Sequence, residues 1–162
     1  MPRFTSFSMR PFEPQDAKAF RELNEAWIST LFALEEKDRL TLGDPQGQII
    51  AHGGHILMAF VDGQPAGCAA LLPRHSGSYE LGKMCIAESA RGQGFGREVL
   101  NYAIHHARSL GASHLYLETS HKLPHAIHLY ESAGFEHLPP HRIVPSPYSR
   151  ADVYMELALS AP

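Results

Sequence analysis

Hydrophobic positions along the chain alternate between helical spacing and extended runs. From Phe20 to Leu31 the apolar residues recur with the spacing of one helix face, which predicts an amphipathic helix with Pro14 near its start. The same spacing between residues 95 and 107 predicts a second long helix, ended by Gly111 as a C-terminal glycine cap. A shorter helix is expected where Pro124 stands early and a glycine follows late.

The remaining apolar runs are predicted strands. Two of them flank Asp62-Gly63, which is typical of a β-hairpin turn. Further strands are expected over residues 3–12, 78–87, 114–119, 135–138 and 152–159. A short helix is expected in the polar stretch that follows the first helix, before GDPQG breaks the chain. This order predicts one domain over residues 1–162, an α/β fold of the α+β type with a largely antiparallel sheet.

Composition narrows the function classes. The chain has 162 residues, 44% hydrophobic and 19% charged, which suits one globular domain. A formal net charge of −3 argues against a nucleic-acid partner. No apolar run is long enough to cross a membrane and no signal-peptide pattern opens the chain, so we expect a cytoplasmic protein without a membrane partner. The eleven histidines show no familiar metal-ligand spacing, so no metal is expected.

Residues 91–96, RGQGFG, are the sharpest local signal. A strand that runs through a glycine-rich loop into a helix exposes backbone N–H groups and the positive end of the helix dipole, which together bind phosphate. The spacing does not fit the loop of P-loop nucleotide hydrolases, because Gly96 is followed by Arg97 and Glu98. It does not fit the dinucleotide-binding loop either, since the glycines are spaced G-x-G-x-G.

The R-x-x-G-x-G pattern of Arg91, Gly94 and Gly96 resembles the acyl-CoA loop of the GNAT superfamily of N-acyltransferases. Two further features support the resemblance: the acidic strand ELGKMCIA before the loop, and LYESAGF at residues 129–135, similar to the family's L-Y-x-x-x-G-F. The resemblance covers roughly residues 5–159. It implies a mostly antiparallel sheet of six to seven strands flanked by about four helices, with a splayed strand pair that binds acyl-CoA.

The resemblance implies an N-acetyltransferase that moves the acetyl group of acetyl-CoA to a primary amine by direct attack in a ternary complex. A small-molecule amine is favoured as acceptor, ahead of a peptide amine. Residues 20–50 and 136–151 would shape the acceptor pocket, and they carry no transferable motif. A CoA-binding sensor or scaffold without catalysis is the alternative function. The family's frequent homodimers make a homodimer an expectation by resemblance alone.

Three residues are the candidates for proton transfer. Glu80 stands where histone-acetylating members of the family place a strand glutamate that serves as general base, and Glu118 is the alternative base. Tyr130 matches the tyrosine of L-Y-x-x-x-G-F, and an ordinary phenol pKa of about 10 suits donation to a thiolate. Simple strand alternation predicts Met84 on the face of Glu80, and Lys83 on the opposite face.

The resemblance also assigns the CoA contacts. Main-chain groups of Met84, Cys85 and Ile86 would pair with the pantetheine arm, and Ser120 stands where the family often has an asparagine. The pyrophosphate would lie on the backbone amides of the loop, namely Arg91, Gly92, Gln93, Gly94, Phe95, Gly96 and Arg97. A rival mechanism passes through an acetyl-cysteine intermediate on Cys85. A single cysteine on an apolar strand is, however, usually a small residue of the core. His52 and His55 are candidates for the acceptor pocket.

Overall fold

The computed structural model describes residues 6–159 and contains one seven-stranded sheet in the order β1-β2-β3-β4-β5-β7-β6. The strands are β1 (Phe7–Pro11), β2 (His55–Val61), β3 (Gln64–Pro73), β4 (Tyr79–Ile86), β5 (His114–Thr119), β6 (Glu136–His137) and β7 (Val153–Ala158). All neighbouring pairs are antiparallel except β4 and β5, which are parallel. The expected fold class and largely antiparallel sheet are confirmed.

Five α-helices lie in the described part of the chain: α1 (Ala17–Leu31), α2 (Glu36–Gly43), α3 (Pro45–Gln48), α4 (Phe95–Ser109) and α5 (Pro124–Ser132). The short α3 was not expected, because GDPQG was interpreted as a simple break. The carboxylate of Asp44 accepts a hydrogen bond from the Gly47 backbone N–H at 3.0 Å, and this N-cap starts the turn. None of these helices is long and apolar enough to cross a membrane.

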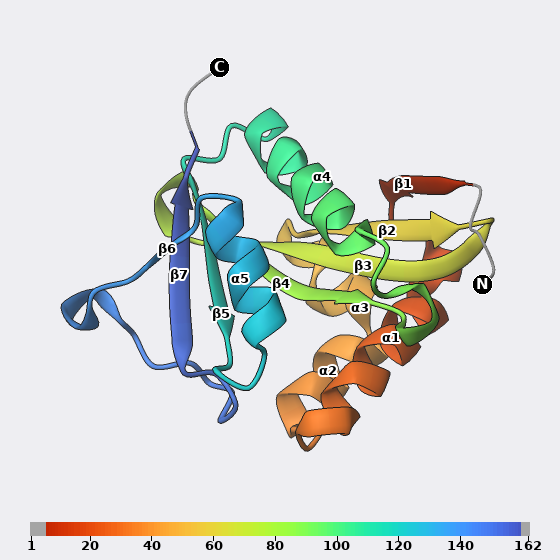
Figure 1. Cartoon of the computed structure of the whole chain (residues 1–162), viewed down its shortest axis with the longest axis horizontal. Coiled ribbons are helices and arrows are strands. Elements are labelled where there is room, and N and C mark those ends of the chain that lie inside the picture. The colour runs from red at the N-terminus through yellow and green to blue at the C-terminus, as the bar shows by residue number, and fades with distance from the viewer. Residues whose placement is uncertain (1–5, 160–162) are drawn as a thin grey trace.

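The helices cover the two faces of the sheet (Figure 1). On one face, α4 and α5 bury Val99, Leu100 and Tyr130 against strand residues such as Leu57 and Leu117. On the other face, α1 and α2 bury a second core, made of Phe20, Ile28, Leu42, Ile49, Ile56, Met58, Cys68, Ala70 and Cys85. Strand β2 is apolar after His55 because its alternate residues lie in the two different cores, Leu57 and Ala59 in one and Ile56 and Met58 in the other.

The turn and helix-end residues predicted from the sequence have the expected backbone conformations and positions. Asp62 and Gly63 both have positive φ, 49° and 81°, as a two-residue hairpin turn between β2 and β3 requires. Gly111 follows the end of α4 with φ 76°, the left-handed conformation of a helix-capping glycine. Pro124 begins α5. These three local predictions are confirmed.

A β-bulge in β4 corrects the predicted faces of that strand. Cys68 pairs with Cys85 and Ala70 with Gly82, so Lys83 and Met84 together lie opposite one residue of β3. Lys83 has φ 51°, in the left-handed region. The extra residue reverses the alternation: Met84 and Ile86 pack toward α4 and α5, whereas Cys85 joins the core under α1. The prediction that Met84 shares a face with Glu80 was therefore wrong, and Lys83 reaches Asp38 of α2 rather than the face of α4.

Candidate active site

The two halves of the sheet part between β4 and β5 (Figure 1). The ladder between these parallel strands has only two pairs, Tyr79 with Leu115 and Glu80 with Tyr116. Beyond Glu80 the strands diverge, so the β5-facing edge of β4 has no ladder partner there. A cavity of about 300 Å³ lies at this split, lined by both strands, the end of α1, α5 and the segment before β7. The divergence of β4 and β5 thus brings backbone and side chains from distant segments of the chain around one cavity.

Two carboxylates approach each other at the point where the strands part. Glu80 and Glu118 both line the cavity, and Glu118 lies two residues beyond the partner of Glu80 in β5. Burial, followed by the negative charge of Glu118, raises the pKa of Glu80 to about 7. Glu118 Oε2 accepts a hydrogen bond from the Tyr116 hydroxyl at 2.7 Å. Glu80 is thus a carboxyl group that can exchange a proton near neutral pH.

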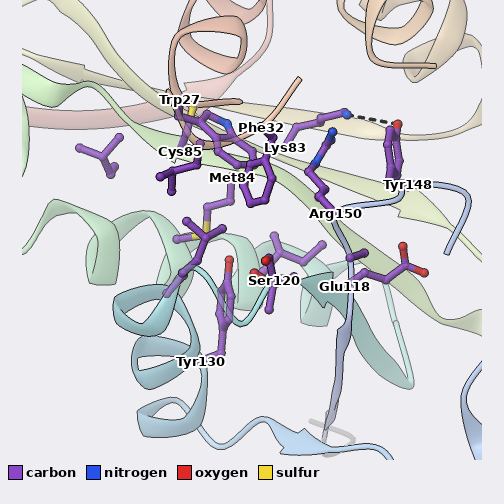
Figure 2. Close-up of a pocket in the computed structure, with 18 of the residues that line it drawn as sticks. Trp27, Phe32, Lys83, Met84, Cys85, Glu118, Ser120, Tyr130, Tyr148 and Arg150 are labelled. Carbon is purple, nitrogen blue, oxygen red and sulfur yellow. Dashed lines mark hydrogen bonds between the residues drawn. The ribbon is translucent and has the colours of Figure 1, made fainter. Parts of the chain in front are cut away.

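Tyr130 reaches the cavity from α5. Figure 2 shows its hydroxyl directed toward the space between the strands. The ring lies in the core and makes an edge contact with Phe135 at 5.8 Å between ring centroids. Burial, with a smaller effect of the Cys85 thiol, raises the pKa of Tyr130 to about 12. The phenol therefore keeps its proton at neutral pH, and it is a weaker acid than an ordinary phenol with a pKa of about 10.

Cys85 lines the same cavity but is held as a neutral thiol. Its Sγ lies 3.6 Å from Sγ of Cys68, directly opposite on β3, and both cysteines are buried. The contact with Cys68 and the burial raise the pKa of Cys85 well above the ordinary value for a thiol. A thiolate is the nucleophilic form of cysteine, so these surroundings suppress its reactivity.

The glycine-rich loop lies where β4 leads into α4. Gly92 and Gly94 have φ of 78° and 83°, and a Cβ on either would meet no atom within 4 Å, so the loop is open to an approaching group. The first turn of α4 leaves backbone N–H groups without partners inside the helix. Arg91 Nε donates to the Ile86 carbonyl at 3.1 Å, which ties the loop to the end of β4.

Comparison with known proteins agrees with this geometry. Residues 9–135 match the model of the acetyltransferase (GNAT) family. The chain belongs to this family. It is 31% identical over 119 residues to the uncharacterized N-acetyltransferase YjgM of Escherichia coli (strain K12), covering 68% of this chain and 71% of YjgM. The expected family and the acetyltransferase class are thereby confirmed.

Solved structures of GNAT proteins share the fold. An acetyltransferase of the family from Staphylococcus aureus Mu50 gives a TM-score of 0.85 at 16% identity, covering 96% of this chain and 100% of that one. The structure of yncA from Salmonella typhimurium, solved with its cofactor acetyl-CoA, gives 0.71 at 20% identity, covering 96% of this chain and 95% of that one.

The structure brings most of the residues singled out in the GNAT motifs to one cavity. Its lining includes the three proton-transfer candidates and five of the predicted CoA contacts: Glu80, Glu118, Tyr130, Met84, Cys85, Ile86, Arg91 and Ser120. Ser120 is buried, and its hydroxyl accepts a hydrogen bond from the Lys122 backbone N–H. Gly92 to Arg97 lie outside this lining, in the loop and the start of α4. The ring of Phe95 stacks on the ring of Phe7.

The two histidines predicted for the acceptor pocket lie outside the cavity at the splay. His55 packs against Tyr79 and against His106 of α4, on the opposite side of the sheet from α1. Neither His52 nor His55 lines the cavity at the splay. Within residues 6–159 there is no group of three or more histidine, cysteine, aspartate or glutamate side chains placed to hold a metal ion.

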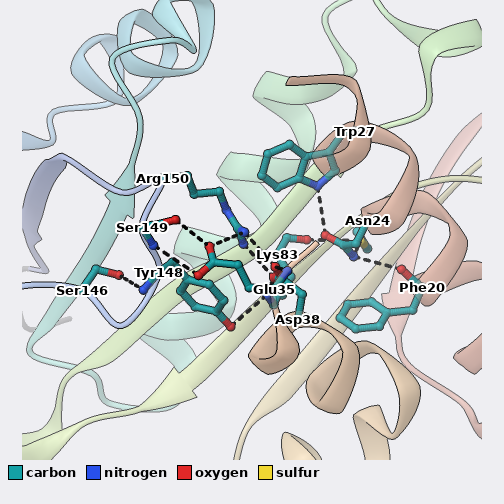
Figure 3. A network of polar contacts seen from close by, with 11 residues as sticks. Phe20, Asn24, Trp27, Glu35, Asp38, Lys83, Ser146, Tyr148, Ser149 and Arg150 are labelled. Carbon is teal, nitrogen blue, oxygen red and sulfur yellow. Dashed lines mark hydrogen bonds and ion pairs between the residues drawn. The ribbon is translucent and has the colours of Figure 1, made fainter. Parts of the chain in front are cut away.

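Sequence reasoning missed a buried ionic cluster at the α2 side of the cavity. We call it the Asp38 cluster; it consists of Glu35, Asp38, Lys83, Tyr148 and Arg150 (Figure 3). The Asp38 carboxylate accepts from Lys83 Nζ at 3.2 Å and from both Nη atoms of Arg150, at 2.8 and 2.7 Å. Its side chain is 0% exposed, against 8% for Lys83 and 12% for Arg150.

The Asp38 cluster positions three elements around the site. It joins the first turn of α2, the bulge of β4 and the segment that leads into β7. Hydrogen bonds from Arg150, together with the backbone N–H of Glu35 and the charge of Lys83, outweigh burial and lower the pKa of Asp38 to about 2. The one local signal was the pairing of Glu35 with Asp38 as a helix capping box.

Proposed function

We propose that this GNAT protein transfers the acetyl group of acetyl-CoA to a primary amine by direct attack in a ternary complex. The observation that carries the proposal is the pairing, around one cavity, of a carboxyl group with a pKa near 7 and a phenol that keeps its proton. One suits removal of a proton from an ammonium group and the other suits protonation of a thiolate.

Acetyl-CoA is the expected second substrate. Its pyrophosphate would lie on the backbone amides of residues 91–97 and the N-terminus of α4. The edge of β4 over Met84–Ile86, which has no β5 partner, offers main-chain groups to the pantetheine arm. Arg91 and Arg97 are exposed cations at the loop and can balance phosphate charge. The structure of yncA with acetyl-CoA supports this choice of donor by fold alone.

Glu80 is our choice for the general base over Glu118. Both line the cavity, but one oxygen of Glu118 already accepts the Tyr116 hydroxyl. Glu80 has a pKa of about 7, so at slightly alkaline pH most of it is ionised and can accept a proton. The amine nitrogen would then attack the thioester carbon, the C–S bond would break, and the departing CoA sulfur would take the proton of the Tyr130 hydroxyl. The second proton that the nitrogen loses as the amide forms would restore the Tyr130 hydroxyl.

Direct attack is preferred to an acetyl-cysteine intermediate. Formation of such an intermediate needs the Cys85 thiolate as nucleophile. The Cys68 contact and burial outweigh the charge of Arg91 and hold Cys85 in its protonated form. The acetyl group is therefore expected to pass to the amine in a single transfer.

Two measurements test the proposal. Isothermal titration calorimetry with acetyl-CoA and with desulfo-CoA checks donor binding, and absence of binding for both would refute it. A screen of primary amines, read by release of the CoA thiol, then checks turnover. Binding without thiol release from any amine would support the alternative, a non-catalytic CoA-binding module.

A further inference from the structure

Three cations surround the ring of Tyr148 at one end of the cavity. Arg150, Lys83 and Lys37 lie 4.5, 4.7 and 5.3 Å from its ring centroid. They come from the segment before β7, the bulge of β4 and α2 respectively. Lys83 Nζ also donates to the Tyr148 hydroxyl at 3.3 Å. Figure 2 shows Lys83, Tyr148 and Arg150 together on the wall opposite Tyr130.

The cations of Lys83 and Arg150 share one carboxylate. Asp38 serves both Lys83 and Arg150, and Glu35 lies 3.5 Å from Arg150. Among residues 6–159, Lys83 therefore shares its one carboxylate partner within 4 Å with a second cation. Lys83 has three N–H donors, and its acceptors within residues 6–159 are Asp38 and the Tyr148 hydroxyl. A nearly buried ammonium with a donor to spare, on the wall of a cavity, is suited to bind an anionic group.

The other end of the same wall is acidic. Glu80 lies three residues before Lys83 in β4, and Glu118 faces it from β5. The positive charges of Lys37 and Lys83 act on Glu80, so the two ends are within electrostatic reach of each other. Trp27 and Phe32, at the end of α1, provide apolar surface in the cavity. The cavity therefore presents one anionic end, one cationic end and an aromatic side.

The geometry points to an acceptor that carries both charges: a small amine with a carboxylate a few atoms away, its amine at Glu80 and its carboxylate at Lys83 and Arg150. This inference rests on the proposed function, because it says what the acceptor carries besides its amine. Glu80 and Lys83 are three residues apart, a separation of about 10 Å along a regular strand, and the bulge shortens it. Two hydrogen bonds of about 3 Å each leave room for only a few atoms between the charged groups.

The test compares α-amino acids with their carboxamides, using leucine with leucinamide and phenylalanine with phenylalaninamide. The change removes the negative charge and leaves the side chain and amine in place. Because it also alters the reactivity of the amine, the informative quantity is the ratio of kcat/KM within a pair, compared between protein variants. Lys83→Met should lower the preference for the carboxylate by about tenfold to a hundredfold. Lys83→Arg should retain most of that preference, and Lys18→Met, an exposed change on α1, should leave it unaltered.

A second arm uses the wild-type protein alone, in case Lys83→Met does not fold. 3-Phenylpropionate has the carboxylate and lacks the amine, so it should compete with an amine acceptor, whereas 3-phenylpropanamide should not. Equal inhibition by the two compounds would overturn the inference, and so would an unchanged ratio of kcat/KM for amino acid and carboxamide in folded Lys83→Met. In either case, thiol release with the carboxamides as acceptors would leave the proposed function standing. Thiol release from no amine at all would overturn the proposed function itself.

Discussion

The replacement Asp38→Asn tests how the Asp38 cluster stabilises the fold. Asparagine keeps the size of the side chain but removes the charge, and it turns an amide N–H₂ toward groups that are already donors. Among residues 6–159, the nearly buried Lys83 would then have no carboxylate within 4 Å, and Arg150 would keep only its 3.5 Å contact with Glu35. We therefore expect a large loss of stability from a change that alters almost no volume.

Two arguments bound the loss in the free energy of unfolding. Removing one partner of a buried ion pair costs about 3–5 kcal/mol, because the remaining charge is left uncompensated. The fall in the pKa of Asp38 from 3.8 to about 2 corresponds to roughly 2 kcal/mol in favour of its charged form. The range of about 2–5 kcal/mol implies a fall in Tm of roughly 5–20 °C for a domain of this size.

Urea unfolding, followed by the fluorescence of Trp27, measures the change, since Trp27 is the only tryptophan in the chain. Arg150 lies 5.9 Å from the Trp27 ring centroid, so the probe reports on the cluster itself. Glu22→Gln is the matched control: it removes a carboxylate from an exposed pair with Lys18 and should cost no more than about 0.5 kcal/mol.

The pH dependence gives an independent check. The folded-state pKa of Asp38 is lowered, so its stabilisation is complete above the unfolded value of 3.8 and is lost as pH falls toward 2. The difference between wild type and Asp38→Asn should therefore shrink over that interval. A loss below about 1 kcal/mol at pH 7, or a difference that does not change with acid, would refute the reasoning.

Three further predictions concern the chemistry. Glu80→Gln should lower kcat/KM by about a hundredfold and abolish the rise of kcat/KM with pH that is centred near 7 in wild type; a persisting inflection would place the base elsewhere. Tyr130→Phe should lower kcat more than it raises KM for the amine, and an unchanged kcat would remove Tyr130 from the acid role. Cys85→Ala should retain turnover in steady-state assays with unchanged sequential kinetics, whereas complete loss in a folded, CoA-binding variant would revive the acetyl-cysteine route.

Much of the fold could be predicted because its signals are local. The apolar stripes of α1 and α4, the Asp62-Gly63 turn and the glycine after α4 depend on neighbours a few residues away, and the structure has all of them. The loop motif and L-Y-x-x-x-G-F likewise lie in short segments, and they were sufficient to indicate the family that the comparisons confirm.

The site depended on tertiary structure in two respects. The bulge at Lys83 inserts one residue into β4 and reverses the faces of Met84, Cys85 and Ile86. The pattern of polar and apolar residues along the strand does not predict this bulge. Asp38 stands in a polar stretch that looks like a solvated helix, and Arg150 lies in a proline-rich loop 112 residues later. Sequence alone determined most of the elements and the glycine-rich loop. Only folding decided which charges are buried together, because desolvation and pairing depend on segments that meet in space.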